Sequence, residues 1–410
     1  SGSPGTKNKK CMKNVLLIGS ELGKGGAERS ISLLSYHLEE LGYNVTLCIL
    51  SGTGRERFYR TCKKVVFTDP PAYTGIIGKV KAWRYRLNFI KKLKRENNID
   101  VSISFLEGPD YVNVLTKGKE KVVLSIRGSK MHDKVISGMM GAVRKKALIP
   151  QLYRKANEIV CVTKALSDEL SEHFGIPISK LTTIYNFYET AEITKLANET
   201  LTPEEQQIFS CPVIITSGRL HVAKEQDKLI RILKLVKPVT NARLMILGDG
   251  ELKQSFIDLC ASLDLVCCDW QEGYKDADVY LMGFQQNAFK FYKHSHLFAL
   301  SSSWEGFPNV LAEALICKIP VVTTDCPTGP REILNVPGLG KEPVVTCIRT
   351  EVGSLLSMLN IINQERFAMW AQEINYWLAS PKPATGEFEK LTNRFTLEAM
   401  LKEWQTVIEN

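Results

Sequence analysis

The 410-residue sequence lacks the features that define two broad classes of protein. No apolar run approaches the roughly 20 residues that cross a bilayer, which excludes an integral membrane protein. The N-terminus lacks the hydrophobic core of a signal peptide, so we expect a cytoplasmic chain. The opening Ser-Gly-Ser-Pro-Gly-Thr is typical of a cloning remnant, and the fold is expected to start near Met12.

Paired cysteines and a nucleotide P-loop are also missing. The eleven cysteines form no Cys-x-x-Cys pair, and most lie in apolar stretches, as Cys48 and Cys161 do. This pattern predicts reduced core thiols rather than disulfides or a zinc site. The glycines of the first loop, Gly25 and Gly26, are not followed by Gly-Lys-Ser/Thr, so they form either a phosphate- or sugar-binding turn or a plain tight turn.

Charge is unevenly divided along the chain. Residues 1–190 carry 32 Lys and Arg against 17 Asp and Glu, a net +15, whereas residues 191–410 carry 21 against 27, a net −6. The basic half is therefore expected to meet an anionic partner, which is nucleic acid, a phospholipid surface or a phosphorylated substrate. Charge alone does not choose among these.

Short apolar runs alternate with amphipathic stretches, which predicts repeated β-α units and parallel sheets. Expected strands lie at 15–18, 45–50, 101–105, 121–126 and 158–162, and again at 213–217, 243–247, 279–282, 297–300 and 321–324. The predicted domains are 12–188, a linker or peripheral segment at 189–210, 211–385, and a C-terminal helix within 386–410 that closes the second domain or crosses back to the first. Ligands are expected in a cleft at the carboxyl ends of the strands.

Two segments of the second half carry groups that suit phosphate. A helix is expected to start at Pro308, leaving the backbone N–H groups of Asn309 and Val310 at its positive end. Earlier in the chain, Arg219 and Lys224 follow a strand end and suit a diphosphate.

Together these segments resemble the retaining glycosyltransferases of family four, which have the GT-B fold of two Rossmann-like doubly wound domains facing a central cleft. The resemblance runs from Val15 to about Phe395. It rests on Gly25-Gly26-Ala27-Glu28, Ile184-Tyr185-Asn186, Gly218-Arg219-Leu220 with Lys224, Gly248-Asp249-Gly250, Gly283-Phe284-Gln285, Glu305 to Glu313, and Cys326 to Ile333.

The resemblance implies a role for each matching residue. Arg219 and Lys224 would neutralise the leaving diphosphate of a nucleotide-sugar, Glu305 would lie beside the donor sugar, and Glu313 would hold the ribose hydroxyls. Fixed charges of this kind stabilise the charge that develops during glycosyl transfer. The other expected donor-binding residues are Gly25, Gly26, Gly218, Gly283, Phe284, Phe307, Pro308, Asn309 and Val310.

One departure concerns the strand that ends at Ile126. Many relatives carry a His there, whereas this sequence has Arg127 and places His132 further on. Arg127 is expected either to join the catalytic centre by binding a phosphate or to be a loop cation.

Neither a metal nor another cofactor is expected. Asp276-Ala277-Asp278 imitates the Asp-x-Asp motif of another glycosyltransferase fold, but it precedes a strand and is typical of a solvated turn. His294 and His296 lack accompanying ligands at suitable spacing.

A basic amphipathic helix is expected at 79–95. Its apolar face holds Val80, Trp83, Leu87 and Ile90, and its cations include Lys81, Arg84, Lys91 and Lys92; Arg144 and Lys145 belong to a second cationic segment. The pattern predicts binding to an anionic membrane surface. The alternative is an apolar stripe packed on the domain's own sheet beneath a solvated charged face.

These observations favour a retaining transferase at the inner face of the cytoplasmic membrane. It would move a sugar, a hexose or N-acetylhexosamine, from a uridine diphosphate donor to a lipid-diphosphate-linked glycan. A soluble acceptor is the first alternative. A nucleic-acid-binding protein is the second, but the basic segments contain no known nucleic-acid module.

Overall fold

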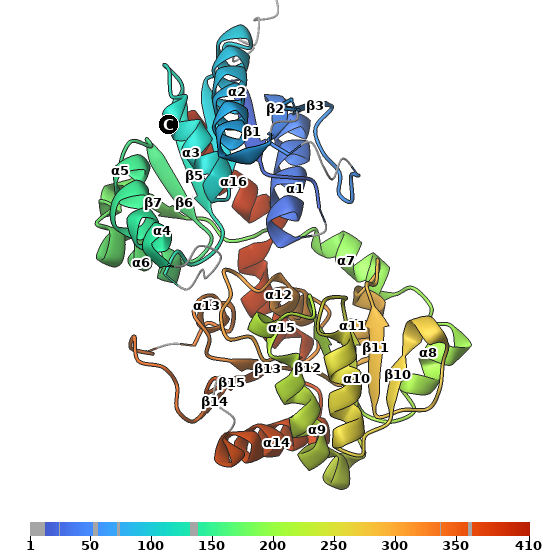
Figure 1. Cartoon of the computed structure of the whole chain (residues 1–410). Coiled ribbons are helices and arrows are strands. Elements are labelled where there is room, and N and C mark those ends of the chain that lie inside the picture. Colours follow the sequence, from blue (N-terminus) through green and yellow to red (C-terminus); the bar gives the residue numbers. More distant parts are fainter. Residues whose placement is uncertain are drawn as a thin grey trace, which may run out of the picture. The chain divides into compact units, whose positions relative to one another are not determined.

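The computed structural model describes residues 13–23, 25–51, 56–71, 74–131, 138–336, 338–359 and 363–410. It divides into two compact units, one formed by Ser1–Ile184 with Leu401–Asn410 and the other by Tyr185–Met400. Each unit contains one sheet, and the two sheets are parallel except for one edge strand. Figure 1 labels most of their strands and helices. The predicted pair of parallel α/β domains is therefore confirmed.

The first unit contains a seven-stranded sheet in the order β3-β2-β1-β4-β5-β6-β7. Its strands are β1 (Asn14–Gly19), β2 (Asn44–Ile49), β3 (Lys64–Phe67), β4 (Val101–Phe105), β5 (Lys121–Ile126), β6 (Glu158–Cys161) and β7 (Leu181–Thr183). Its helices are α1 (Gly26–Glu40), α2 (Gly75–Glu96), α3 (Glu107–Leu115), α4 (Gly138–Val143), α5 (Ile149–Tyr153) and α6 (Lys164–Phe174), and a π-helical turn, Arg144–Leu148, joins α4 to α5.

The central strand β1 is apolar from Val15 to Ile18, and these residues are completely buried because both faces of the strand are covered. Leu16 and Ile18 lie in a buried cluster with Ile90 of α2 and Val112 of α3. Such continuous apolar runs are typical of parallel strands buried on both faces. The order of strands reverses between β1 and β4, and in sheets of this kind ligands bind outside the carboxyl ends near that point.

The last helix, α16 (Leu397–Glu409), ends in the first unit. Lys13 Nζ donates to the carbonyl oxygens of Ile408 and Glu409 at 2.7 and 2.8 Å, and Lys121 Nζ donates to Val407 O at 2.7 Å. The two lysines thus satisfy terminal carbonyls at the negative end of the helix dipole. Of the two paths that the sequence allowed for this helix, the chain follows the one that returns to the first unit.

The second unit contains an eight-stranded sheet in the order β10-β11-β9-β8-β12-β13-β15-β14, in which only β14 is antiparallel to its neighbour. Its strands are β8 (Val213–Ser217), β9 (Arg243–Leu247), β10 (Cys267–Asp269), β11 (Val279–Gly283), β12 (Leu297–Leu300), β13 (Val321–Thr324), β14 (Cys347–Arg349) and β15 (Gly353–Leu356). Its helices are α7 (Thr190–Ala197), α8 (Pro203–Ile208), α9 (Gln226–Thr240), α10 (Lys253–Ser262), α11 (Phe289–His294), α12 (Asn309–Ile316), α13 (Pro330–Ile333), α14 (Gln364–Ala379) and α15 (Thr385–Thr392).

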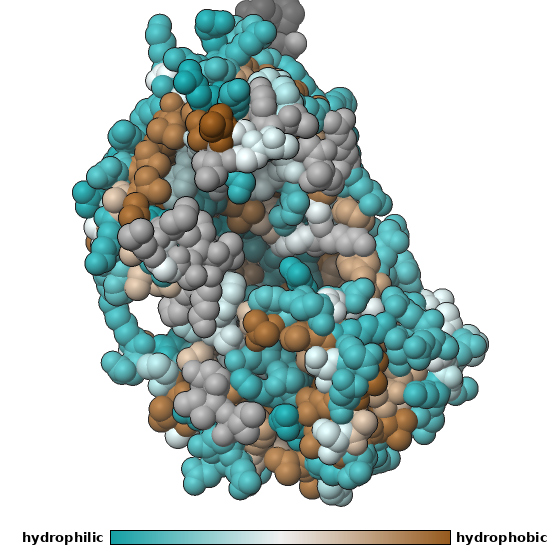
Figure 2. All heavy atoms as spheres, viewed as in Figure 1, coloured by the Kyte–Doolittle hydropathy of each residue, from teal (hydrophilic) through white to brown (hydrophobic). Residues whose placement is uncertain are grey.

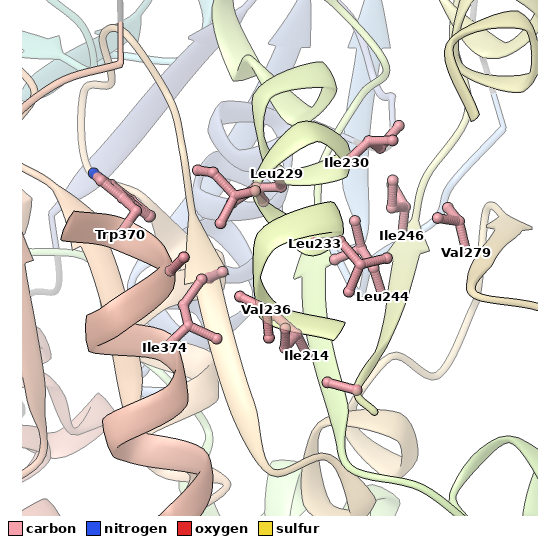
Figure 3. Packing of buried hydrophobic residues seen from close by; sticks show 14 of the residues in the cluster. Ile214, Leu229, Ile230, Leu233, Val236, Leu244, Ile246, Val279, Trp370 and Ile374 are labelled. Atoms are coloured by element: carbon pink, nitrogen blue, oxygen red, sulfur yellow. The ribbon is translucent and has the colours of Figure 1, made fainter. Parts of the chain in front are cut away.

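The core of the second unit is built where α9 and α14 lie side by side (Figure 3). Leu229 and Leu233 of α9 pack with Trp370 and Ile374 of α14, and all four side chains are buried. Burying each aliphatic side chain contributes about 1.5–3 kcal/mol. This core fixes the start of α9, which follows the loop that carries Arg219.

The segment 189–210, expected to be a linker or a peripheral segment, forms α7 and α8 within the second unit. Thr202 and Glu205 form a reciprocal capping box at the start of α8, and Ile193 and Ile208 are buried. A few apolar anchors and one cap order this polar stretch, so of the two expectations it is the helical segment, not a linker, that the structure has, and the unit begins at Tyr185.

Candidate active site

Glycines bring the loops at the carboxyl edge of the second sheet into contact. The N–H of Gly248 donates to Gly283 O at 2.8 Å. A Cβ at Gly248 would lie 2.0 Å from Gly218 O, and one at Gly250 would lie 2.4 Å from Leu220 O. Because these neighbours are backbone atoms, only glycine fits at positions 248 and 250. The loops after β8, β9 and β11 therefore form one rigid rim.

At this rim, Lys224 and Glu305 form an ion pair. Lys224 Nζ lies 2.6 Å from Glu305 Oε1, and Ser302 Oγ donates to the same oxygen at 2.6 Å. The hydroxyl of Ser301 also donates to the carbonyl oxygen of Lys224 at 2.7 Å. Glu305 is only 9% exposed. Lys224 and Glu305, both predicted to act in the catalytic centre, are 81 positions apart in the sequence and in direct contact in the structure.

The turn that carries Glu305 is held by the loop after β13. The N–H of Glu305 donates to Pro327 O at 2.8 Å, and the N–H of Thr328 donates back to Glu305 O at 3.2 Å. A Cβ at Gly329 would lie 2.6 Å from Cδ of Pro308. The Cys326 to Ile333 motif therefore supports the Glu305 turn, a role that sequence reasoning missed because only the fold brings these loops together.

Arg219 stands apart from this ion pair. Its side chain is 72% exposed and lies 3.3 Å from Glu251 Oε2. A hydrogen bond from the backbone of Glu251, with the nearby charges of Arg219 and His221, lowers the pKa of the Glu251 carboxyl. Arg219 is thus an accessible cation on the rim.

The N-terminus of α12 faces the same edge of the sheet, because this helix follows the loop after β12. Pro308 is the N-cap rather than the first helical residue, and its carbonyl accepts from Leu311 N at 3.0 Å. The N–H groups of Asn309 and Val310 precede the first hydrogen bond of the helix, as expected for a phosphate-binding terminus.

The remaining predicted donor residues differ in exposure. Phe307 is buried against the rings of Tyr185 and Phe395, at centroid distances of 5.9 and 5.5 Å. Glu313 is also buried, whereas Phe284 is 49% exposed. Glu313 is therefore not the solvated helical residue that an isolated glutamate would be.

Three predicted site residues belong to the first unit. Gly25 is the N-cap of α1, and Gly26 is its first residue. Arg127 donates from Nη2 to Ser30 Oγ at 2.8 Å, and its guanidinium lies 5.3 Å from the ring centroid of Phe105. Arg127 is therefore held against the start of α1 at the carboxyl edge of the first sheet. His132 lies outside the described residues.

The structure contradicts the prediction that Arg144 is a membrane-binding cation. Arg144 has only 3% of its side chain exposed, and its Nε lies 2.5 Å from Glu107 Oε1. Lys130 Nζ lies 3.5 Å from the other carboxylate oxygen of Glu107. Arg144 is therefore a buried guanidinium paired with the half-buried carboxylate of Glu107. Lys145 is half-buried and donates to Met131 O at 2.6 Å.

The basic helix exists as α2, but its apolar face is mostly used inside the unit. Trp83 and Leu87 pack with the buried Ile90, as expected for an apolar stripe packed inside its own domain. Val80, in contrast, is 55% exposed. The four cations predicted to meet a membrane, Lys81, Arg84, Lys91 and Lys92, are all exposed. On the face shown in Figure 2, hydrophilic residues predominate and hydrophobic ones form separate groups. None of the described helices is long and apolar enough to cross a bilayer.

The residues that imitate metal motifs have local partners. Asp276 pairs with Arg243 at 2.5 Å, and Asp278 pairs with Lys237. His296 accepts from Val213 N at 3.2 Å. Within the described ranges, no three His, Cys, Asp or Glu side chains gather as a metal site would require.

Comparison with known proteins assigns both halves of the chain. Residues 24–192 match the family model described as Glycosyltransferase Family 4, and residues 211–348 match Glycosyl transferases group 1.

Curated relatives agree with these matches. The 4-α-N-acetylgalactosaminyltransferase of Campylobacter jejuni that is named for N-acetylgalactosamine-N,N'-diacetylbacillosaminyl-diphospho-undecaprenol is 30% identical, over 77% of this chain and 81% of that one. An uncharacterised glycosyltransferase of Methanocaldococcus jannaschii is 34% identical over 63% of this chain. The matching region spans 64% of that relative, just under two thirds of its length.

Solved structures share the fold. An Anabaena protein in complex with UDP covers 97% of this chain and 100% of its own, with a TM-score of 0.68 and 16% identity. A lipopolysaccharide outer core galactosyltransferase covers 96% and 99%, with a TM-score of 0.67 and 16% identity. These structures show the GT-B fold, and the Campylobacter relative together with the matches to both halves shows that the chain belongs to the family 4 and group 1 glycosyltransferases.

Proposed function

We propose that this enzyme transfers a sugar from a UDP-sugar to a lipid-diphosphate-linked glycan with retention of the α configuration, and that it needs no metal ion. The observation that carries the proposal is the Lys224–Glu305 pair at the edge where Arg219 and the N-terminus of α12 are also placed. This edge offers cations and N–H groups for a diphosphate together with one carboxylate for the sugar.

Each group has a defined task in the proposed reaction. The bond between the anomeric carbon and the β-phosphate oxygen breaks, and the acceptor oxygen bonds to that carbon on the same face. The acceptor proton passes to a phosphate oxygen of the leaving UDP. Arg219 and Lys224 neutralise the charge that grows on the phosphate, and Glu305 stabilises the positive charge on the sugar.

A uridine donor is supported by relatives of the same fold. The Anabaena protein has been solved with UDP, with UDP and glucose, and with UDP-glucose. Glu313, buried one turn into α12, is assigned to the ribose, and the exposed Phe284 and the adjacent Gly283 to the base.

The acceptor assignment is supported by the Campylobacter relative, whose name specifies a diphospho-undecaprenol acceptor. The exposed cations of α2, Lys81, Arg84, Lys91 and Lys92, would meet an anionic membrane at the cytoplasmic face. A soluble acceptor is the second candidate, since a Bacillus anthracis relative, 28% identical over 42% of each chain, is named N-acetyl-α-D-glucosaminyl L-malate synthase.

A panel of nucleotide-sugars tests the donor and the metal requirement together. We expect a UDP-sugar to be consumed, an α-linked product by NMR, and full turnover in excess chelator. Consumption of only another nucleotide-sugar would refute the uridine assignment, and a β-linked product would refute retention. Loss of turnover that magnesium or manganese restores would refute metal independence.

Vesicle flotation tests the acceptor side. Binding to anionic vesicles that weakens as salt rises is expected if the enzyme works at a membrane surface. Absence of binding, with transfer to a water-soluble sugar or hydroxy acid, would favour the soluble acceptor.

A further inference from the structure

The Ile184-Tyr185-Asn186 motif marks the point where the chain enters the second unit, and Asn186 and the nearby Tyr188 contact the helix α12 directly. Asn186 Nδ2 donates to Asn309 Oδ1 at 2.7 Å, and the hydroxyl of Tyr188 donates to the same oxygen at 2.6 Å. Asn309 is the first residue of α12. The start of the second unit is therefore bonded to a residue of the candidate donor site 121 positions away.

Asn186 and Tyr188 form a rigid frame for these bonds. Asn186 is 7% exposed and Tyr188 is 1% exposed. The backbone of Tyr188 is fixed from both sides, because its N–H donates to Phe395 O at 2.9 Å and its carbonyl accepts from Leu397 N at 3.2 Å. A frame held this tightly fixes the rotation of any side chain that it binds.

These bonds determine which way the Asn309 carboxamide points. A carboxamide has one acceptor oxygen and one nitrogen with two hydrogens. Since the oxygen accepts from both Asn186 and Tyr188, the nitrogen is turned away from them. The two hydrogens of this nitrogen therefore do not serve Asn186 or Tyr188, and the residue that carries them is the first of α12, where the backbone N–H groups also lack helical partners.

We propose that Asn186 and Tyr188 are positioning residues, which orient the Asn309 carboxamide so that its nitrogen donates a hydrogen bond to the diphosphate of the donor. This inference rests on the proposed function, because it takes a nucleoside diphosphate as the ligand. It gives the Tyr185-Asn186 motif a task in donor binding, beyond joining two domains.

The Asn309→Asp variant separates this task from a structural one. Its carboxylate keeps an oxygen that accepts from Asn186 and Tyr188 but loses the N–H groups and brings a negative charge toward the phosphates. We expect the Kd for UDP to rise by about tenfold or more, since a hydrogen bond to a charged group is lost. Uridine, which has no phosphate, should bind as it does to the wild type, and the melting temperature should stay near the wild-type value.

The Tyr188→Phe variant tests the positioning role, with Tyr376→Phe on the surface of α14 as the matched control. Loss of one of two bonds to Asn309 should raise the KM for the UDP-sugar several-fold, and the control should leave it unchanged. If Tyr188→Phe lowers the melting temperature without changing KM, its role is only structural and the proposal fails.

Calorimetric titration of UDP distinguishes this inference from the proposed function. Equal UDP affinities of wild type and Asn309→Asp would overturn the inference, as would an equal loss of uridine and UDP binding. A wild type that binds UDP but transfers no sugar would overturn the proposed function, with the Kd values still deciding the inference. A wild type that binds no UDP would overturn both.

Discussion

Lys224 and Ser302 both donate to one oxygen of Glu305, each at 2.6 Å. The carboxylate is 9% exposed, so its charge is shielded from water and depends on the ammonium beside it. A pair of this kind is costly to break from one side, because the partner left behind is a buried charge. For a substitution at either residue of this pair, the unfolding free energy and the turnover rate therefore have to be measured separately.

Glu305→Gln is the most informative change at this pair. Its carboxamide oxygen still accepts from Ser302 and Lys224, but the negative charge is removed. We expect kcat to fall by about 100-fold or more, since one electrostatic group at the reacting centre is lost, while the unfolding temperature changes little.

Lys224→Ala should reduce turnover to a similar extent but should also destabilise the second unit. The control is Lys390→Ala, which removes an exposed lysine paired with Glu387 on α15 and should leave both measurements unchanged. Near-normal transfer by Lys224→Ala would contradict the assignment of this lysine to the diphosphate.

Gly248→Ala should disrupt the rim of the donor site. Gly248 has φ +131°, and a Cβ there would meet Gly218 O at 2.0 Å, so backbone atoms must move. The expected loss of unfolding free energy is about 3 kcal/mol or more, together with weaker UDP binding.

Gly386→Ala is the matched control in the same unit, because a Cβ there meets open space and alanine favours the helix. Both variants are compared by denaturant unfolding and UDP titration. A fully stable Gly248→Ala that binds UDP normally would show that the loops do not depend on this close approach.

The central strands are predictable from the sequence because buried parallel strands are continuous apolar runs, as in β1 and β9. The sequence does not predict the edge strands β3, β7, β10 and β14 or the inner strand β15, all of which are three or four residues long and only partly apolar. Strands of three or four residues are too short to give a recognisable apolar pattern, and this limited the prediction of the fold.

At the site, the sequence indicated the charged residues but not what holds them. Glu305 and Lys224 belong to recognisable motifs, whereas the contacts of Ser302 with Glu305 and of Tyr188 with Asn309 follow no helical or strand period. The prediction that Arg144 contacts a membrane is wrong for the same reason. Its partner Glu107 lies 37 positions earlier, so no local pattern reveals the pair.

Arg144 and the exposed cations of α2 should therefore behave differently when substituted. Arg144→Ala leaves the half-buried Glu107 with Lys130 but without its guanidinium, and the lost charged hydrogen bonds should cost about 1.5–3 kcal/mol of unfolding free energy. A Lys91→Ala, Lys92→Ala double variant should change stability by less than about 1 kcal/mol, since both lysines are exposed.

Vesicle flotation completes the comparison. If α2 meets the membrane, the Lys91 and Lys92 double variant should bind anionic vesicles more weakly and with a smaller salt dependence. Unchanged flotation of this variant would exclude that part of α2 as the contact surface.

Asp110 should make the first unit less stable as pH rises. Its carboxyl is completely buried at the start of α3, where it accepts from Ser104 Oγ at 2.7 Å and from the hydroxyl of Tyr153 at 3.1 Å. Burial raises its pKa from 3.8 to about 7, opposed mainly by the charge of Lys130, while Glu107 adds to the increase. The folded chain therefore keeps a proton that the unfolded chain releases.

Between pH 4 and 7 the folded state binds more protons at Asp110, so the free energy of unfolding falls as pH rises through this range. The contribution is complete below about pH 4 and lost above about pH 7. Asp110→Asn keeps the shape of the side chain and can still bond Ser104 and Tyr153, but it has no proton to release. Its unfolding free energy should fall less steeply over this range than that of the wild type, and it should be the more stable protein at pH 8.

Denaturant titrations at pH 5, 6, 7 and 8 measure the two slopes, and Asp168→Asn on the exposed face of α6 controls for loss of any carboxylate. Parallel slopes for wild type and Asp110→Asn would show that Asp110 is already ionised in the folded protein.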